Sequence, residues 1–115
     1  MHILVSGSLA YDKILDFPGR FSDHILPGKI HNLNVGFAVK KISDNFGGTA
    51  GNIAYNLALL GERPCIISSA GDDFAPYRRW FRRHRVNTSR VRIVRGESTG
   101  ACTVITDSAD NQIAA

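Results

Sequence analysis

Two neighbouring glycines, Gly47 and Gly48, stand directly before a run of residues with helical spacing, and this junction is well suited to binding a ligand. Glycines let a ligand approach the backbone closely, and the first N–H groups of a helix have no intrahelical partners. Asn52 falls in the first turn of the expected helix, where its amide can donate to and accept from a hydroxyl group. The junction therefore predicts a receptor for polar ligand oxygens.

A second candidate group is the carboxylate of Asp12, at the start of an extended run that reaches Phe17. A carboxylate can accept hydrogen bonds from both hydroxyls of a vicinal diol. The alternatives remain open: Asp12 as a surface aspartate, and the glycine pair as a tight turn before a helix cap. No Gly-Lys-Ser/Thr follows the glycines and the spacing of a dinucleotide fingerprint is absent, so neither nucleotide-binding motif is supported.

The elements around these groups predict an α/β fold. Short apolar runs at 3–5 and 65–70 are typical of buried strands, and they flank an expected helix that Thr49 caps and Gly61 ends. The apolar residues of that helix predict one buried face, comprising Ala50, Ile53, Ala54, Leu57 and Leu60. Strand, helix and strand in this order predict a parallel crossover, and open α/β sheets bind ligands at the carboxyl ends of such strands.

Residues 31–39 alternate strictly between apolar and polar, which predicts a half-buried strand leading toward the glycine pair. Its apolar face would cover either the ligand cleft or the same sheet of a second subunit. Further along, Asp72 or Asp73 is expected to cap an amphipathic helix with Pro76 in its first turn. Strands at 91–94 and 99–106, a turn at 107–111 and a strand from 112 are expected to follow.

Composition indicates one ordinary domain of 115 residues. The two cysteines lie in apolar runs without metal-ligand spacing, no run is long enough to span a membrane, and the N-terminus is unlike a secretion signal, so we expect a reducing cytoplasm. The net charge is +4, and residues 78–115 hold eight Lys/Arg against three Asp/Glu. The segment from Arg78 to Arg95 allows a small basic nucleic-acid-binding module, but aromatic residues at helical spacing favour a solvated helix face.

The order of several motifs resembles the ribokinase-like (PfkB) family of carbohydrate and nucleoside kinases. They are Gly7-Ser8 with Asp12, the alternating segment, Phe46-Gly47-Gly48-Thr49-Ala50-Gly51-Asn52, Ala70-Gly71-Asp72-Asp73 and Glu97-Ser98-Thr99-Gly100. Within the family the chain is most similar to bacterial adenosine kinases, through Phe17-Pro18-Gly19-Arg20-Phe21-Ser22 and Asp73-Phe74-Ala75. The resemblance implies the N-terminal part of a kinase domain over residues 1–115. That part would contain the start of a parallel or mixed sheet flanked by helices, with lid strands at about 12–17, 31–43 and 99–106.

The resemblance also implies the roles of individual residues. Asp12 would hold the ribose hydroxyls, the Gly48 backbone and Asn52 would grip the same sugar, and Ser8 would contact the base. Phe37 would lie in the lid strand over the ligand, and the lid sheet supports dimers in some members. The substrate-binding residues so implied are Ser8, Asp12, Phe37, Gly47, Gly48, Asn52 and Cys102.

Two departures from the family pattern shape the expected activity. Cys102 stands where adenosine kinases place an aromatic residue against the base, so ribose, fructose or another sugar remains an alternative acceptor to adenosine. The Gly-Ala-Gly-Asp type motif that supplies the general base and anion hole is absent from these residues. Such a kinase uses Mg²⁺ and ATP, so we expect a truncated chain that contains no catalytic residue, binds the acceptor and transfers no phosphate alone.

Overall fold

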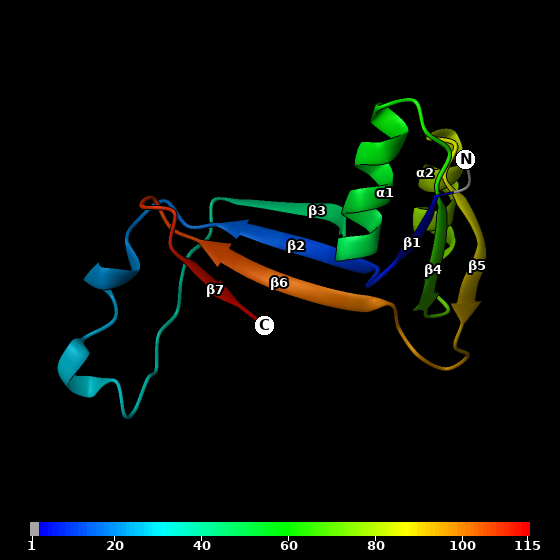
Figure 1. The fold of residues 1–115 in the computed structure, drawn as a ribbon. Helices are drawn as coiled ribbons and strands as arrows, with labels where there is room; N and C mark the ends of the chain where they lie inside the picture. The colour runs from blue at the N-terminus through cyan, green and yellow to red at the C-terminus, as the bar shows by residue number, and fades with distance from the viewer. Residues whose placement is uncertain (1–2) are drawn as a thin grey trace. The chain divides into compact units, whose positions relative to one another are not determined.

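The computed structural model describes residues 3–115, so the first two positions of the predicted domain lie outside the described residues. Contacts divide the chain into two compact units. The first unit contains the residues up to Tyr11 together with Phe46–Ala101, and the second contains Asp12–Asn45 and Cys102–Ala115. Figure 1 traces the chain through the elements of both units.

The first unit is built on a parallel sheet whose strand order is β1-β4-β5. Its strands are β1 (Leu4–Ser6), β4 (Cys65–Ala70) and β5 (Asn87–Ile93). Helix α1 (Thr49–Leu59) precedes β4, and helix α2 (Ala75–Arg83) connects β4 to β5 (Figure 1). The predicted order of strand, helix and parallel strand is therefore confirmed.

The core of the first unit lies between one face of this sheet and both helices. Side chains of a strand alternate between its two faces, and each strand contributes to the buried face. The main contributors are Val5, Ile66 and Val91 from the strands and Ala50, Ala54, Tyr77 and Phe81 from the helices. On the opposite face Leu4 and Ile67 remain exposed.

Helix α1 differs from the expectation in its cap and in its buried side. Gly48 occupies the N-cap position, so the predicted cap, Thr49, is already the first helical residue. Ala50, Gly51 and Ala54 are buried, whereas Ile53 and Leu60 are exposed. Small residues form the buried side because a Cβ at Gly51 would collide with the Tyr77 hydroxyl. Gly61 has φ +91° and ends the helix as predicted.

Helix α2 is amphipathic as predicted, with Pro76 in its first turn and Tyr77 and Phe81 buried. Its arginines lie on the other side, and Arg79, Arg82 and Arg83 are exposed. The predicted aspartate cap is wrong, because Phe74 holds the N-cap position without a side-chain hydrogen bond.

Asp72 and Asp73 instead hold the loop that follows β5. Asp72 accepts a hydrogen bond from the Gly96 N–H at 2.7 Å, and Asp73 accepts one from the Thr99 N–H at 2.8 Å. Hydrogen bonds from the Thr99 side chain and backbone hold the pKa of Asp73 below its ordinary value. Carboxylates at this loop therefore order the chain before its next strand.

The second unit contains most of a four-stranded sheet of order β3-β2-β6-β7. Its strands are β2 (Ala10–Asp16), β3 (Lys41–Gly47), β6 (Gly100–Thr106) and β7 (Gln112–Ala114), and the connection after β2 contains the short 3-10 turns η1 (Phe21–Asp23) and η2 (Pro27–Lys29). Strands β6 and β7 pair antiparallel, as expected from the turn at 107–111. Asp107 accepts hydrogen bonds from the Ala109 and Asn111 N–H groups within that turn.

The lid strand predicted over 31–43 is wrong for most of its length, because residues 31–39 form no strand and β3 begins only at Lys41. Val35, Phe37 and Val39 are half-buried as the alternation predicts, but Leu33, on the same predicted face, is exposed. The Phe37 ring packs against Phe17 and Phe21, with centroid distances of 5.0 and 4.9 Å. Packing of these side chains, without hydrogen bonds to a neighbouring strand, thus accounts for the alternation of apolar and polar residues.

Both cysteines are free thiols, and Cys65 and Cys102 are each half-buried. Across residues 3–115 no helix is both long and apolar enough to cross a membrane.

Candidate functional site

The loop after β1 is joined to the beginning of α1 by several hydrogen bonds. The Ser8 Oγ accepts from the Thr49 N–H at 3.0 Å, and the Ser8 carbonyl accepts from the Ala50 N–H at 3.0 Å. The Ser8 N–H donates to Thr49 Oγ1 at 3.3 Å. Two helix-terminal N–H groups that were expected to face a ligand are therefore occupied by Ser8. This contradicts the simplest form of the predicted receptor for polar ligand oxygens, in which these N–H groups would face the ligand.

Gly48 allows this loop to approach the helix. Its φ of +87° lies in a region that residues with a side chain rarely adopt. A Cβ at this position would lie 2.5 Å from the Ser8 carbonyl oxygen and 2.7 Å from Leu9 Cα. The glycine is thus required by both backbone angle and space, and it leaves the backbone of the junction uncovered by any side chain of its own.

An aromatic layer supports the junction from inside the first unit. The Tyr77 hydroxyl donates to the buried Gly47 carbonyl at 2.8 Å, and its ring stacks on Phe46 with centroids 4.5 Å apart. Tyr11 donates its hydroxyl to the Asp73 carbonyl at 2.8 Å. Burial raises the pKa of Tyr11 above its ordinary value, and the charge of Asp73 raises it further. Tyr11 therefore acts as a neutral hydrogen-bond donor near pH 7.

A cavity of about 580 Å³ opens at the carboxyl ends of the parallel strands. It lies where open α/β sheets bind ligands, and its volume falls within the range of small-molecule sites. Its lining is mostly small and polar, and it consists of Ser6, Gly7, Ser8, Leu9, Ile67, Ser68, Ser69, Arg92 and Gly100. Such a lining offers hydroxyl and backbone groups to a polar ligand, and Arg92 supplies a positive charge.

The predicted site residues divide between the two units. Ser8, Gly47, Gly48 and Asn52 belong to the first unit, where Gly47 is buried and Ser8 and Asn52 are exposed. Only Ser8 among them lines the cavity at the strand ends. The second unit contains the remaining three, Asp12, Phe37 and Cys102, all half-buried.

Sequence reasoning missed Ser68 and Arg92. The Ser68 Oγ donates to the Gly7 carbonyl at 2.6 Å and so joins β4 to the loop after β1. Arg92 pairs in register with Ser69, and both line the cavity. The signal that could have found them is their position at the carboxyl ends of two strands, since paired residues of neighbouring strands share a face.

The described residues contain no group of three or more His, Cys, Asp or Glu side chains arranged to hold a metal ion. The Mg²⁺ expected with ATP therefore has no ready ligand set within residues 3–115.

Comparison with known proteins identifies the chain's relatives. A sequence model described as pfkB family carbohydrate kinase matches residues 18–115. A nucleoside kinase from Methanothermobacter thermautotrophicus is 34% identical over 82 residues, which cover 70% of this chain and 26% of that protein.

Solved structures of a nucleoside kinase are also similar to this chain. The nucleoside kinase of Burkholderia thailandensis in complex with inosine superposes with a TM-score of 0.83 at 35% identity, covering all of this chain and 35% of the other. The same enzyme in complex with ADP-inosine gives a TM-score of 0.76 at 37% identity, with coverage of 100% and 36%. The chain thus spans about a quarter to a third of these relatives' length.

Proposed function

The chain belongs to the pfkB family of carbohydrate kinases, and we propose that it forms the acceptor-binding portion of a nucleoside kinase of that family. The observation that carries this proposal is the superposition of this whole chain on 35% of a nucleoside kinase solved in complex with inosine, at 35% identity. The polar cavity at the strand ends supports the proposal, because one of its lining residues, Ser8, is hydrogen-bonded to the start of α1.

In this proposal the acceptor is adenosine or a related nucleoside. Asp12 accepts hydrogen bonds from the two ribose hydroxyls, and the Asn52 amide and the backbone at Gly47 and Gly48 hold the same sugar. Ser8 contributes its exposed surface toward the base, because its Oγ, N–H and carbonyl group already form hydrogen bonds with the first turn of α1. Each ribose hydroxyl proton needs one hydrogen-bond acceptor. The carboxylate of Asp12 and the amide oxygen of Asn52 are acceptors of this kind.

The roles of Phe37 and Cys102 concern the selection of the base. Phe37 packs against two phenylalanines, so a ligand would meet only the remaining part of its ring. Cys102 is half-buried on β6 and offers a small polarisable surface rather than an aromatic one. We therefore propose weak discrimination between purine bases, with ribose or fructose as the alternative acceptor.

The complete reaction would move the γ-phosphate of ATP to the primary hydroxyl of the nucleoside. Phosphoryl transfer depends on positioning and charge stabilisation, with a base to accept the hydroxyl proton. A relative that forms an ADP-inosine complex supports ATP as co-substrate. The present residues supply only the acceptor side, so we propose that this chain alone binds nucleoside in a reducing cytoplasm and releases no ADP.

The four-stranded sheet supports a further element of the proposal, a homodimer formed through the lid strands. Ile42 on β3 and Ile113 on β7 are 57% and 41% exposed, and covering such side chains favours association. Light scattering at increasing concentration measures the mass directly. A constant monomer mass up to high micromolar concentration would remove the dimer.

Calorimetric titration of the chain with adenosine, inosine, ribose and fructose tests the proposed function. We expect both nucleosides to bind more tightly than either sugar, because only they engage the base side of the site. Tighter binding of ribose or fructose would favour a sugar kinase. ADP release from Mg-ATP above a buffer control would contradict the proposal that the chain is inactive alone.

A further inference from the structure

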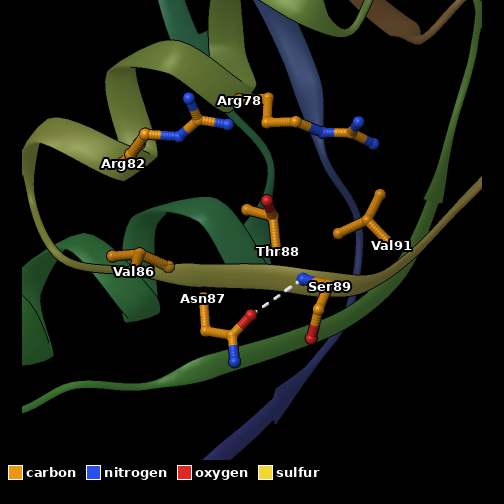
Figure 2. Close-up of a pocket in the computed structure, with 7 residues that line it drawn as sticks. All are labelled: Arg78, Arg82, Val86, Asn87, Thr88, Ser89 and Val91. Atoms are coloured by element: carbon orange, nitrogen blue, oxygen red, sulfur yellow. Dashed lines mark hydrogen bonds between the residues drawn. The ribbon is translucent and has the colours of Figure 1, made fainter.

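A second cavity, of about 390 Å³, lies between α2 and β5 and shares no lining residue with the cavity at the strand ends. Its lining comes from Arg78 and Arg82 on α2 together with residues at and near the start of β5, and all of it belongs to the first unit. Figure 2 shows these residues arranged around the gap between helix and strand. No carboxylate lines this cavity.

The two arginines give the cavity an uncompensated positive charge. They stand four residues apart, so they share one face of α2. Neither forms an ion pair within residues 3–115, where Lys13 and Asp44 make the single salt bridge. The Nε of Arg78 is buried and has no hydrogen-bond partner among the described residues. A buried donor without an acceptor is unfavourable, so an acceptor oxygen that reached Arg78 Nε would stabilise this guanidinium.

The position of each group favours a compact anion carrying an organic substituent. The Arg78 guanidinium lies 5.3 Å from the centroid of the Phe74 ring, which restrains its plane. Figure 2 shows the Thr88 and Val91 side chains pointing from β5 toward α2, the helix that carries both arginines. The hydroxyl of Thr88 can donate to an anion, while the buried Val86 and Val91 form an apolar wall.

The strand itself is poorly suited to pairing with an added peptide. Asn87 Oδ1 accepts a hydrogen bond from the Ser89 N–H at 2.8 Å, which occupies one donor of β5 (Figure 2). The register between β4 and β5 also shifts between the pairs of Cys65 and Ile67. An added strand needs a regular row of free backbone groups, so a small ligand fits this edge better.

We propose that this cavity binds a phosphate monoester. The phosphate would lie between Arg78, Arg82 and the Thr88 hydroxyl, because guanidinium groups match phosphate oxygens in geometry and charge. The organic part would occupy the rest of the cavity beside Val86 and Val91, since the cavity is in the size range of small-molecule sites and exceeds what inorganic phosphate fills. Binding of a phosphate monoester in this cavity does not require nucleoside binding at the cavity at the strand ends.

Amide NMR titrations of the 115-residue chain test the proposal with phenyl phosphate, inorganic phosphate and benzyl alcohol as probes. We expect phenyl phosphate to shift the Arg78, Arg82 and Thr88 resonances and to bind several-fold more tightly than inorganic phosphate. Benzyl alcohol should leave them unchanged. In Arg82→Gln the affinity for phenyl phosphate should fall by about tenfold or more, because a charge-assisted contact is lost.

The matched control is Arg79→Gln, which removes the same charge from the same helix at a residue outside the cavity. Its affinity should stay within about twofold of the unchanged chain. Equal losses in both variants would overturn the site in favour of diffuse attraction, as would shifts confined to Ser8 and Gly48. If Arg82→Gln fails to fold, Thr88→Val tests the site instead. Unchanged affinity of that variant for phenyl phosphate would overturn the proposal.

Discussion

The Ser8 Oγ accepts a hydrogen bond from the Thr49 N–H at 3.0 Å, so a residue from the loop after β1 satisfies the first turn of α1 across 41 positions of sequence. A local cap is absent, since Gly48 at the N-cap position has no side chain. The helix that carries Asn52 is thereby fixed to the end of β1, and the site depends on this connection.

Replacing Ser8 by Ala should therefore destabilise the chain by about 1 kcal/mol, as the loss of a helix cap usually does. Urea denaturation followed by circular dichroism measures the change. Ser22→Ala is the control, because Ser22 is exposed in η1. Equal stability of the Ser8 variant and the unchanged chain would show that this hydrogen bond does not hold the helix.

Gly48→Ala should destabilise the first unit by more than about 2 kcal/mol, since alanine is strained at φ +87° and its Cβ would meet the Ser8 carbonyl. The midpoint of urea denaturation gives the effect. Gly36→Ala is a matched control: a Cβ there meets nothing within 4 Å. If both alanine variants unfold at the same urea concentration, the close approach at Gly48 is not required.

Tyr77→Phe leaves the Gly47 carbonyl without its donor in a buried position. An unsatisfied buried carbonyl costs about 1 to 3 kcal/mol, and we expect that loss in the free energy of unfolding. Tyr55→Phe removes a hydroxyl from a half-buried tyrosine on α1 and should change little. A loss that is no larger in Tyr77→Phe than in Tyr55→Phe would contradict the assigned role of this hydrogen bond.

Asp107 should make the stability of the second unit depend on pH. Burial alone would raise its pKa, but hydrogen bonds from the Phe21 backbone and from Asn111 outweigh that effect and lower the pKa to about 2. A carboxyl group with a lowered pKa stabilises the fold above its ordinary pKa of 3.8. This contribution should be lost as the pH falls from about 4 toward 2.

Thermal unfolding between pH 6 and pH 2 measures this dependence in the unchanged chain and in Asp107→Asn. The difference between their melting temperatures should be largest near pH 6 and should shrink below pH 4. Asp23→Asn, at an exposed position of η1, serves as the control. A difference that stays constant down to pH 2 would show that Asp107 does not titrate in this range.

Much of the first unit could be predicted because its signals are local. Continuous apolar runs placed β1 and β4, and the aromatic residues at helical spacing placed α2. The buried side of α1 could not be read from hydrophobicity, because contact with Tyr77 selects Gly51 over Ile53. Asp72 and Asp73 resembled caps, yet their partners, Gly96 and Thr99, lie more than twenty residues away.

In the second unit, the sequence pattern predicted which side chains are buried but not whether the segment forms a strand. Residues 31–39 have a strand's alternation, and Phe37 is half-buried as expected, but its partners are the rings of Phe17 and Phe21. A pattern of period two reports which side chains are buried and not whether a neighbouring strand supplies hydrogen bonds. For the proposed site, residue types indicated Asp12 and Asn52 and the family resemblance implied Ser8, while Ser68 and Arg92 required knowledge of the strand register.

The central claim is that the junction at the start of α1 binds a nucleoside. The most direct test is a two-dimensional amide NMR titration with adenosine of the chain, of Asn52→Ala and of Asn56→Ala, the last altering the same residue type one turn further along α1. The account predicts shifts at Ser8, Asp12, Gly48 and Asn52, and about tenfold weaker binding in Asn52→Ala alone. A dispersed spectrum that adenosine leaves unchanged, or equal losses in both variants, would contradict it.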